Sequence, residues 1–201
     1  VYKRQAVGAV SAFNLTNDPA RTLQTVALQT VMVPLQSSWF TYTDLNTCLY
    51  NGITPLNYAG GAARIVRLIT TYQKNAYNLP DPSYLDVTTL ATNAYIERQV
   101  QYMLLQKFPR CKLAADGTKF GAGNNIVTPS IIRGEVLALY DQWVYQGLVQ
   151  GKDNFADALI VTIDANDPNR VDILLPPYIV GNLVVTAIKN EFRLRLNLPI
   201  Q

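Results

Sequence analysis

Residues 184–196, VVTAIKNEFRLRL, alternate between two chemically different faces without a break. Because successive side chains of a strand point to opposite sides, this pattern predicts one long strand with an apolar face and a charged face. The mostly apolar parity consists of Val184, Thr186, Ile188, Asn190, Phe192, Leu194 and Leu196. Strands usually contain about 5–6 residues, whereas this one covers 13. A terminal strand of that length can leave its own domain and add to a neighbour's sheet.

Upstream of this strand, hydrophobic periodicity predicts two main helices. Residues 86–108 carry apolar side chains at helical spacing, and Pro109 ends that pattern. The spaced set is Val87, Leu90, Ala91, Ala94, Ile96, Val100, Met103 and Leu104. A second helix begins with Thr128 as N-cap and Pro129 at its first position, and it ends at Gly147. Its expected buried stripe is Ile132, Val136, Leu139 and Trp143.

Shorter elements complete the expected order. Two strand pairs are predicted, one over 52–56 and 63–71 around a Gly60-Gly61 turn, and one over 158–163 and 171–175. Short helices are expected over 6–15 and after Thr41, which forms a capping box with Asp44, and residues 21–34 are expected to be extended. The result is an α+β fold: a mixed β-sheet that gathers both ends of the chain, packs against two main helices, and continues into an extended C-terminal strand or arm.

The composition limits the class of function. Of 201 residues, 49% are apolar and 15% are charged. The apolar fraction supports a real core, while a charged fraction below the usual value of about 25% indicates a surface partly covered by partners. A net charge of +3 is too small and scattered to indicate nucleic-acid binding. No run of apolar residues approaches the length of a membrane span, so no membrane insertion is expected.

The sequence argues against an enzyme. It contains no histidine, which removes the commonest general base and metal ligand, and its two cysteines, Cys48 and Cys111, have no metal-binding spacing. Asp164, Asp167 and Asp172 surround a turn but lack the spacing of a calcium loop. Glu97 and Glu135 each have an arginine nearby and are interpreted as solvated or interface charges. We expect no catalytic residues, no cofactor and no metal.

The segment after the first main helix is glycine-rich and basic. Residues 117–123 lack the order of a phosphate-binding loop and are interpreted as a turn between helices. Its basic residues, together with the end of the helix, are Lys107, Arg110, Lys112 and Lys119, and Asp116 is the only acid among them. A favourable interaction with the helix dipole explains the position of Lys107 but not of the other three basic residues. The alternative for the whole set is a surface that docks an acidic protein partner.

Two further observations bear on the chain as a whole. The sequence contains 12 tyrosines, many near the ends of predicted elements, where they suit either an interface or the edge of a core. Residues 1–5, VYKRQ, match the translation of a transposase end sequence used in DNA library preparation. This match predicts that the five residues are not native and that the protein extends further upstream; a native leader is the alternative.

Several segments, in this order and spacing, carry a resemblance to a known family. They are NDPAR at 17–21 with LQT at 23–25, RIVRLITTY at 64–72, SYLDVTTLA at 83–91, KFPRCKL at 107–113, DGTKFG at 116–121, and DPNRVD at 167–172 with LPP at 175–177. Together they resemble the C-terminal part of the contractile tail sheath protein of Mu-like bacteriophages, from about residue 6 to residue 196. No single segment is diagnostic, but the ordered set is specific.

The resemblance implies a structural protein of the virion. Sheath subunits stack in rings around a tail tube, and their lattice contracts to drive the tube through the host envelope and deliver the genome. The implied partners are other sheath subunits, the tail tube protein and the baseplate, with assembly in the host cytoplasm. Residues 1–40 would form the end of an upstream domain and a connecting segment. Residues 41–201 would form the sheath C-terminal domain, with 182–201 as its arm.

The resemblance also suggests where contacts lie. The C-terminal domain lies innermost in this family, and neighbouring subunits exchange terminal arms that complete its sheet. The expected arm contacts are Val184, Ile188, Phe192, Leu194 and Leu196, and the basic residues named above are candidates to face the tube. This sequence lacks the charged segment that the family often has after the second helix, which leaves the tube-facing charges unassigned.

Two other functions remain open at this point. One is a sheath subunit of a non-phage contractile injection system, which the sequence does not separate from a phage sheath. The other is a small cytoplasmic ligand-binding or enzymatic α+β domain. That domain would need a pocket with convergent polar groups near residues 117–123 and a terminal strand paired on both sides within its own domain.

Overall fold

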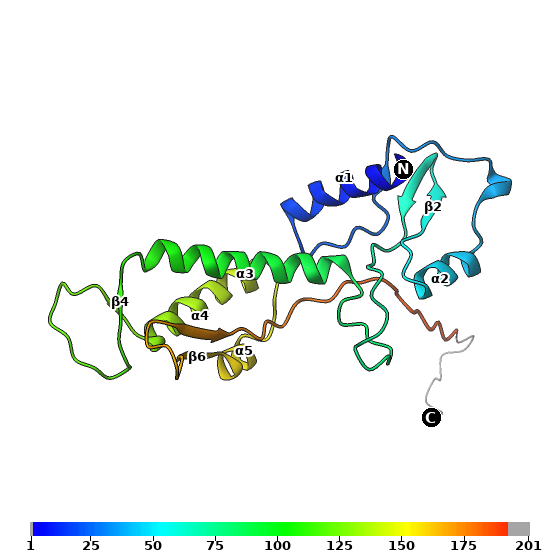
Figure 1. The fold of residues 1–201 in the computed structure, drawn as a ribbon. Coiled ribbons are helices and arrows are strands. Elements are labelled where there is room, and N and C mark those ends of the chain that lie inside the picture. The colour runs from blue at the N-terminus through cyan, green and yellow to red at the C-terminus, as the bar shows by residue number, and fades with distance from the viewer. Residues whose placement is uncertain (1, 193–201) are drawn as a thin grey trace, which may run out of the picture.

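The structure is a computed structural model that describes residues 2–192 (Figure 1). Arm residues Leu194 and Leu196 lie outside the described residues. The helices are α1 (Tyr2–Asn17), the 3₁₀ helix η1 (Gln36–Ser38), α2 (Tyr42–Tyr50), α3 (Val87–Lys107), α4 (Pro129–Tyr145) and α5 (Lys152–Ala158). The strands are β1 (Ala27–Leu28), β2 (Leu56–Ala59), β3 (Ala62–Ile65), β4 (Lys112–Leu113), β5 (Ile126–Val127), β6 (Ile160–Ile163) and β7 (Val171–Leu174). The predicted α+β class is confirmed.

The helix boundaries follow the capping residues of the sequence. Thr41 forms the predicted capping box before α2, because its hydroxyl accepts from the Asp44 amide while the Asp44 carboxylate accepts from the Thr41 amide. Helix α3 has Asp86 as its N-cap, and Pro109 follows its last turn. Helix α4 starts at Pro129 after Thr128, as predicted. The prediction missed α5, which follows Gly151 in the left-handed conformation at φ 67°.

Within residues 2–192 the strands form three separate sheets, whereas a single sheet was predicted. In the first sheet, the order β1-β3-β2 is antiparallel throughout. The hairpin turn lies at Gly60-Gly61 as predicted, with φ 59° and 73°, values that favour glycine. The second sheet is a short parallel pair of β4 and β5, and the third is the antiparallel hairpin β6–β7.

The predicted strand over 63–71 is wrong beyond Ile65. The regular ladder ends there, and Ile69 instead makes an isolated bridge to Asp86. The Ile69 amide also donates to the hydroxyl of Thr54 at 3.0 Å, so a side chain replaces the expected strand neighbour. The other predicted strand, over 52–56, is wrong except at Leu56, because β2 covers Leu56–Ala59.

Two hydrophobic cores organise the described chain. The sheet core contains Leu23, Leu28, Val31, Ala63 and Ile65, and α1 packs against it. The helical core lies among α3, α4, α5 and the β6–β7 hairpin. Its buried residues are Ile96, Val100, Met103, Val127, Ile132, Val136, Tyr140, Trp143, Leu148, Val149, Phe155 and Leu159. Figure 1 shows the two groups of elements at different places along α3.

The first two turns of α3 do not follow the predicted stripe. Leu90 and Ala94 are exposed, and the buried side chains are Thr88 and Thr92. This part of α3 lies between the two cores, where it contacts polar groups: Thr88 accepts a hydrogen bond from Asn182 at 2.6 Å. In the second half of α3 the predicted residues Ile96, Val100 and Met103 are buried.

The C-terminal segment forms no ladder with any other part of the described chain. Residues 181–192 are not in a strand as far as the structure describes them, so the strand predicted from residue 184 onward is not formed within this single chain. The reason is physical: a strand needs backbone hydrogen bonds from a neighbouring strand, and none of the described strands pairs with this segment. Among residues 2–192 no helix is both long and apolar enough to cross a membrane.

Candidate assembly surfaces

Hydrogen bonds attach residues 178–180 of the C-terminal segment to the helical core. The Gln150 amide donates to the Tyr178 carbonyl at 2.8 Å, and the Val180 amide donates to the Leu148 carbonyl at 3.1 Å. The Tyr140 hydroxyl donates to the Gln150 carbonyl at 2.6 Å and accepts from the Tyr178 amide at 3.3 Å. Burial raises the pKa of Tyr140, which keeps the hydroxyl protonated and able to donate. Residues 178–180, here called the root of the arm, are therefore held in a fixed position.

Beyond the root, the predicted arm residues become exposed. Val184 is half-buried, and its carbonyl accepts a hydrogen bond from the Gln24 side chain at 3.2 Å. Ile188 is 86% exposed and Phe192 is 79% exposed. Leu183 at 75% and Val185 at 79% are similarly exposed, so four large apolar side chains lie uncovered within residues 183–192. A concentration of exposed apolar side chains is typical of a surface that contacts a partner. Residues 185–192, the exposed part of the predicted arm, are the first candidate surface.

The structure separates the four predicted basic residues. Lys107, at the end of α3, forms an ion pair with Glu135 of α4, so its charge is locally compensated. Arg110 has a left-handed backbone at φ 60°, Lys112 lies on β4, and Lys119 lies in the following loop. All three are exposed. This loop over residues 110–125 extends from the far end of α3, at the opposite end of the molecule from the C-terminal segment (Figure 1).

Asp116, the acidic residue of this loop, has a structural role that the sequence did not reveal. Asp116 accepts a hydrogen bond from the Ser130 amide, in the first turn of α4, at 3.0 Å. Hydrogen bonds from Ser130 hold the pKa of Asp116 below its usual range. Thr128 makes no capping bond with its own side chain, so Asp116 supplies one. The signal in the sequence was only an Asp-Gly pair 14 residues upstream of Ser130, too distant to indicate a cap.

We expect Asp116→Ala to release the loop from α4. The Ser130 amide would lose its acceptor, and its hydrogen exchange should become about five times faster, as for loss of a typical N-cap. Because the folded-state pKa of Asp116 is lowered, its stabilising effect is present above the unfolded value of about 3.9 and is lost as the pH falls through the folded value. Asp116→Asn keeps an acceptor oxygen and should retain slow exchange but lose this pH dependence. Equal exchange in Asp116→Ala and the unsubstituted chain would contradict the assignment.

The β6–β7 hairpin offers open strand edges. Its inner face packs on the helical core through Val161, Val171 and Ile173. On its outer face Ile160 and Leu174 pair across the strands, and both are exposed. A two-stranded hairpin has unpaired backbone groups along both edges, and such edges accept further strands. The sequence predicted the hairpin but did not indicate that it stands apart from the other strands.

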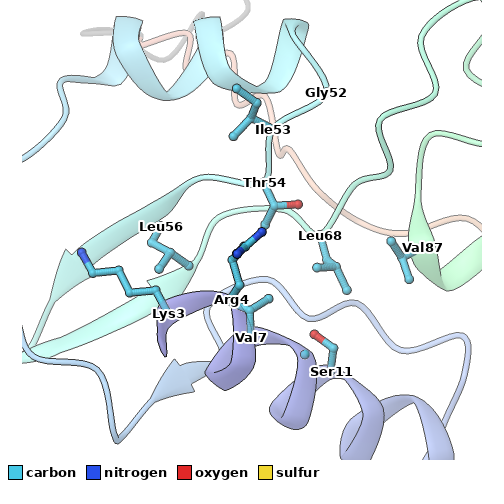
Figure 2. A pocket seen from close by; sticks show the side chains of 11 residues that line it. Lys3, Arg4, Val7, Ser11, Gly52, Ile53, Thr54, Leu56, Leu68 and Val87 are labelled. Atoms are coloured by element: carbon cyan, nitrogen blue, oxygen red, sulfur yellow. The ribbon is translucent and has the colours of Figure 1, made fainter. Parts of the chain in front are cut away.

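Two hollows of about 570 Å³ each lie beside the sheet core. Figure 2 shows the first, where Val7 and Ser11 of α1 lie opposite Leu56, Leu68 and Val87. Its lining is mainly apolar, and the buried Ser11 hydroxyl has no hydrogen-bond partner. The second is lined by residues of α2 and by Val184, Val185 and Thr186. Neither hollow is lined by residues 117–123, and in the described part of the chain no group of three or more potential metal ligands occurs.

Comparisons with known proteins agree on a family. A model of the phage tail sheath C-terminal domain matches residues 80–193. The Mu-like prophage FluMu tail sheath protein of Haemophilus influenzae is 40% identical over 188 residues, which cover 93% of this chain and 38% of that protein. The crystal structure of a sheath tail protein from Desulfitobacterium hafniense shares the fold, with a TM-score of 0.56 at 12% identity, over 82% of this chain and 35% of that one. The resemblance predicted from the sequence is therefore confirmed, and the chain belongs to the phage tail sheath C-terminal domain family.

Proposed function

We propose that this chain is the C-terminal part of a structural subunit of a contractile phage tail sheath. In this role it surrounds the tail tube within the virion, and contraction of the lattice drives genome delivery through the host envelope. The family is structural, and the proposed role requires no catalytic residues, cofactor or metal. Because the chain spans 38% of the matching sheath protein, the rest of the subunit would supply other lattice contacts.

The observation that carries this proposal is the exposed arm. The chain is anchored as far as Val184, and the apolar residues Ile188 and Phe192 then lie uncovered. Burying a large apolar side chain contributes about 1.5–3 kcal/mol. A second copy of the chain is a suitable partner, because its β6–β7 hairpin has open edges that could accept the arm as an added strand. The arm contacts Val184, Ile188, Phe192, Leu194 and Leu196 remain part of this proposal.

This mode of contact favours a helical assembly. The arm and the hairpin are different surfaces, so each contact is heterologous and continues from one subunit to the next. If the rotation does not close a ring, the product is a helix, which is the symmetry that a sheath needs. Contraction would then be a switch between two packings of the same linked subunits, with the arms remaining attached while the bodies move.

The basic loop is the proposed surface toward the tube. Asp116 is engaged in capping α4 and Lys107 is paired with Glu135, which leaves Arg110, Lys112 and Lys119 as exposed cations on a protruding loop. Such a surface suits an acidic patch on the tube protein, with affinity that falls as salt rises. Lys107 belongs to the proposed set with a smaller contribution, because Glu135 compensates its charge.

The domain division is also a proposal. Residues 1–40 would end an upstream domain and connect it to the C-terminal domain of residues 41–201, with the arm starting at 182. Strand β1, before this boundary, pairs with β3, after it. The connecting segment would therefore share the sheet core with the domain that follows. Contact with the baseplate and assembly in the host cytoplasm are parts of the same proposal.

Negative-stain electron microscopy of the complete protein expressed alone would test this function. We expect hollow ridged cylinders, whose formation requires no other phage protein because the proposed arm and its acceptor lie on the same chain. The rival ligand-binding domain predicts separate soluble particles. Two features of the structure disfavour that rival: residues 184–192 are not an internal strand, and residues 117–123 line neither hollow described above.

A further inference from the structure

The junction between the two cores is polar. Helix α3 starts beside the sheet core, where the Val87 amide donates to the Leu68 carbonyl at 3.4 Å, and its apolar burial begins only at Ile96. The buried side chains between these points are Thr88 and Thr92. A threonine side chain buries less apolar area than a leucine or isoleucine side chain, so this stretch of α3 contributes little hydrophobic packing between the two cores.

The chain also joins the two cores through residues 20–23, where Ala20 packs against the helical core and Leu23 lies in the sheet core, and through residues 178–184, here named the strap. On the helical-core side, Ile179 bridges to Val149, and the Val180 amide donates to the Leu148 carbonyl. On the sheet-core side, the Val184 carbonyl accepts from the side chain of Gln24, the residue after buried Leu23. The strap therefore has one end on each core.

Asn182 lies between these two attachments and binds the start of α3. Its side-chain amide donates to the Thr88 hydroxyl at 2.6 Å. Thr88 is 5% exposed, and its carbonyl is also engaged, by the Thr92 hydroxyl at 2.8 Å. Because a buried hydroxyl that loses its partner is destabilising, this contact has more effect than an exposed hydrogen bond of the same length.

We propose that the strap holds the two cores in one orientation, and that the hydrogen bond between Asn182 and Thr88 is its central contact. Release of Asn182 from Thr88 frees the middle of the strap and lets the sheet core rotate relative to the helical core. The exposed part of the arm continues directly from the strap at Val185. A force on the arm is therefore transmitted to the contact that sets the orientation of the cores.

The two cysteines allow a direct test of whether the strap fixes the orientation of the cores. Cys48 lies in α2, on the side of the sheet core, and Cys111 packs against the helical core (Figure 1). Spin labels at both sites would report the distance between the two sides by double electron–electron resonance. We expect a narrow distance distribution in the unsubstituted chain. In Asn182→Ala the distribution should broaden, and the amide hydrogen exchange of the strap should become about five times faster, as for loss of one net hydrogen bond.

Matched variants distinguish loss of the Asn182–Thr88 contact from general destabilisation. Asn190→Ala removes the same side chain from the exposed arm and should behave like the unsubstituted chain. Thr88→Val removes the acceptor while keeping the shape, and combining it with Asn182→Ala should add nothing further. If Asn182→Ala does not fold, Thr88→Val alone supplies the test. A narrow distribution with unchanged strap exchange in either folded variant would overturn the proposal. These measurements use the single chain, so they do not depend on whether it assembles into a sheath.

Discussion

Replacing Phe192 with Asp is expected to abolish sheath polymers while the single subunit stays folded. Phe192 is 79% exposed in the isolated chain, so the change removes almost no intramolecular contact. In the proposed assembly the same position is buried in a neighbouring subunit. There the substitution would remove about 1.5–3 kcal/mol of apolar burial and add a carboxylate to an apolar site. Each 1.4 kcal/mol lowers affinity about tenfold, and the loss is repeated at every subunit of the lattice.

The matched control is Lys189→Asp. It places the same carboxylate three residues away on the opposite parity of the arm, where the Lys189 side chain is exposed and forms an ion pair with Glu191. An exposed pair of this kind contributes about 0–1 kcal/mol, so this variant should still form cylinders. Electron microscopy gives the length of the polymers, and circular dichroism of the soluble fraction reports folding. Cylinders of normal length from Phe192→Asp would show that the arm is not the link between subunits.

The elements that the sequence predicted well are those with local signals. The capping box at Thr41, the Pro129 start of α4 and the Pro109 stop after α3 act within one or two turns of the helix that they bound. Glycines at 60 and 61 likewise determine a turn without distant contacts. The family could be identified because the resemblance rests on an ordered set of segments, which does not require knowledge of tertiary structure.

The arrangement of strands depends on tertiary structure and could not be predicted in this way. The alternation of residues 63–71 is compatible with a strand, but Ile69 meets Thr54 and Asp86, which no local pattern indicates. Buried Thr88 and Thr92 were missed because helical periodicity identifies apolar faces, whereas this face of α3 meets the amide of Asn182. Helix α5 contains only seven residues, too few for a clear periodic signal.

The candidate surfaces were predicted in part. Alternation identified the arm, and Ile188 and Phe192 are indeed exposed in the isolated chain, but contact with a neighbour stays a prediction. The basic cluster was recognised by composition, which does not show that Lys107 pairs with Glu135 on the next helix. Nor could composition show that Asp116 caps α4, because the two partners are joined by a loop of no regular pattern.

The largest loss of stability is expected from Phe155→Ala. Phe155 is 0% exposed and stacks on Tyr140, with ring centroids 3.7 Å apart and planes 8° apart. Replacing a fully buried phenylalanine by alanine costs about 3–5 kcal/mol, which combines lost burial with the cavity that remains. This is a large part of a typical domain stability of about 5–15 kcal/mol. Helix α5 is also too short to be stable by itself, so it depends on this anchor.

The effect should extend to the root of the arm, because the ring that stacks on Phe155 also carries the hydroxyl that binds Gln150 and Tyr178. Urea unfolding followed by circular dichroism would measure the change as a lower midpoint at constant slope. Phe13→Ala is the matched control: Phe13 is 70% exposed on α1, and its loss should change the free energy of unfolding by less than about 0.5 kcal/mol. Equal losses from the two variants would mean that the Tyr140–Phe155 stack does not hold the helical core together. Hydrogen exchange of the Val180 amide would report on the root of the arm. If Phe155→Ala is less stable but this amide exchanges at an unchanged rate, the root is held independently of the stack.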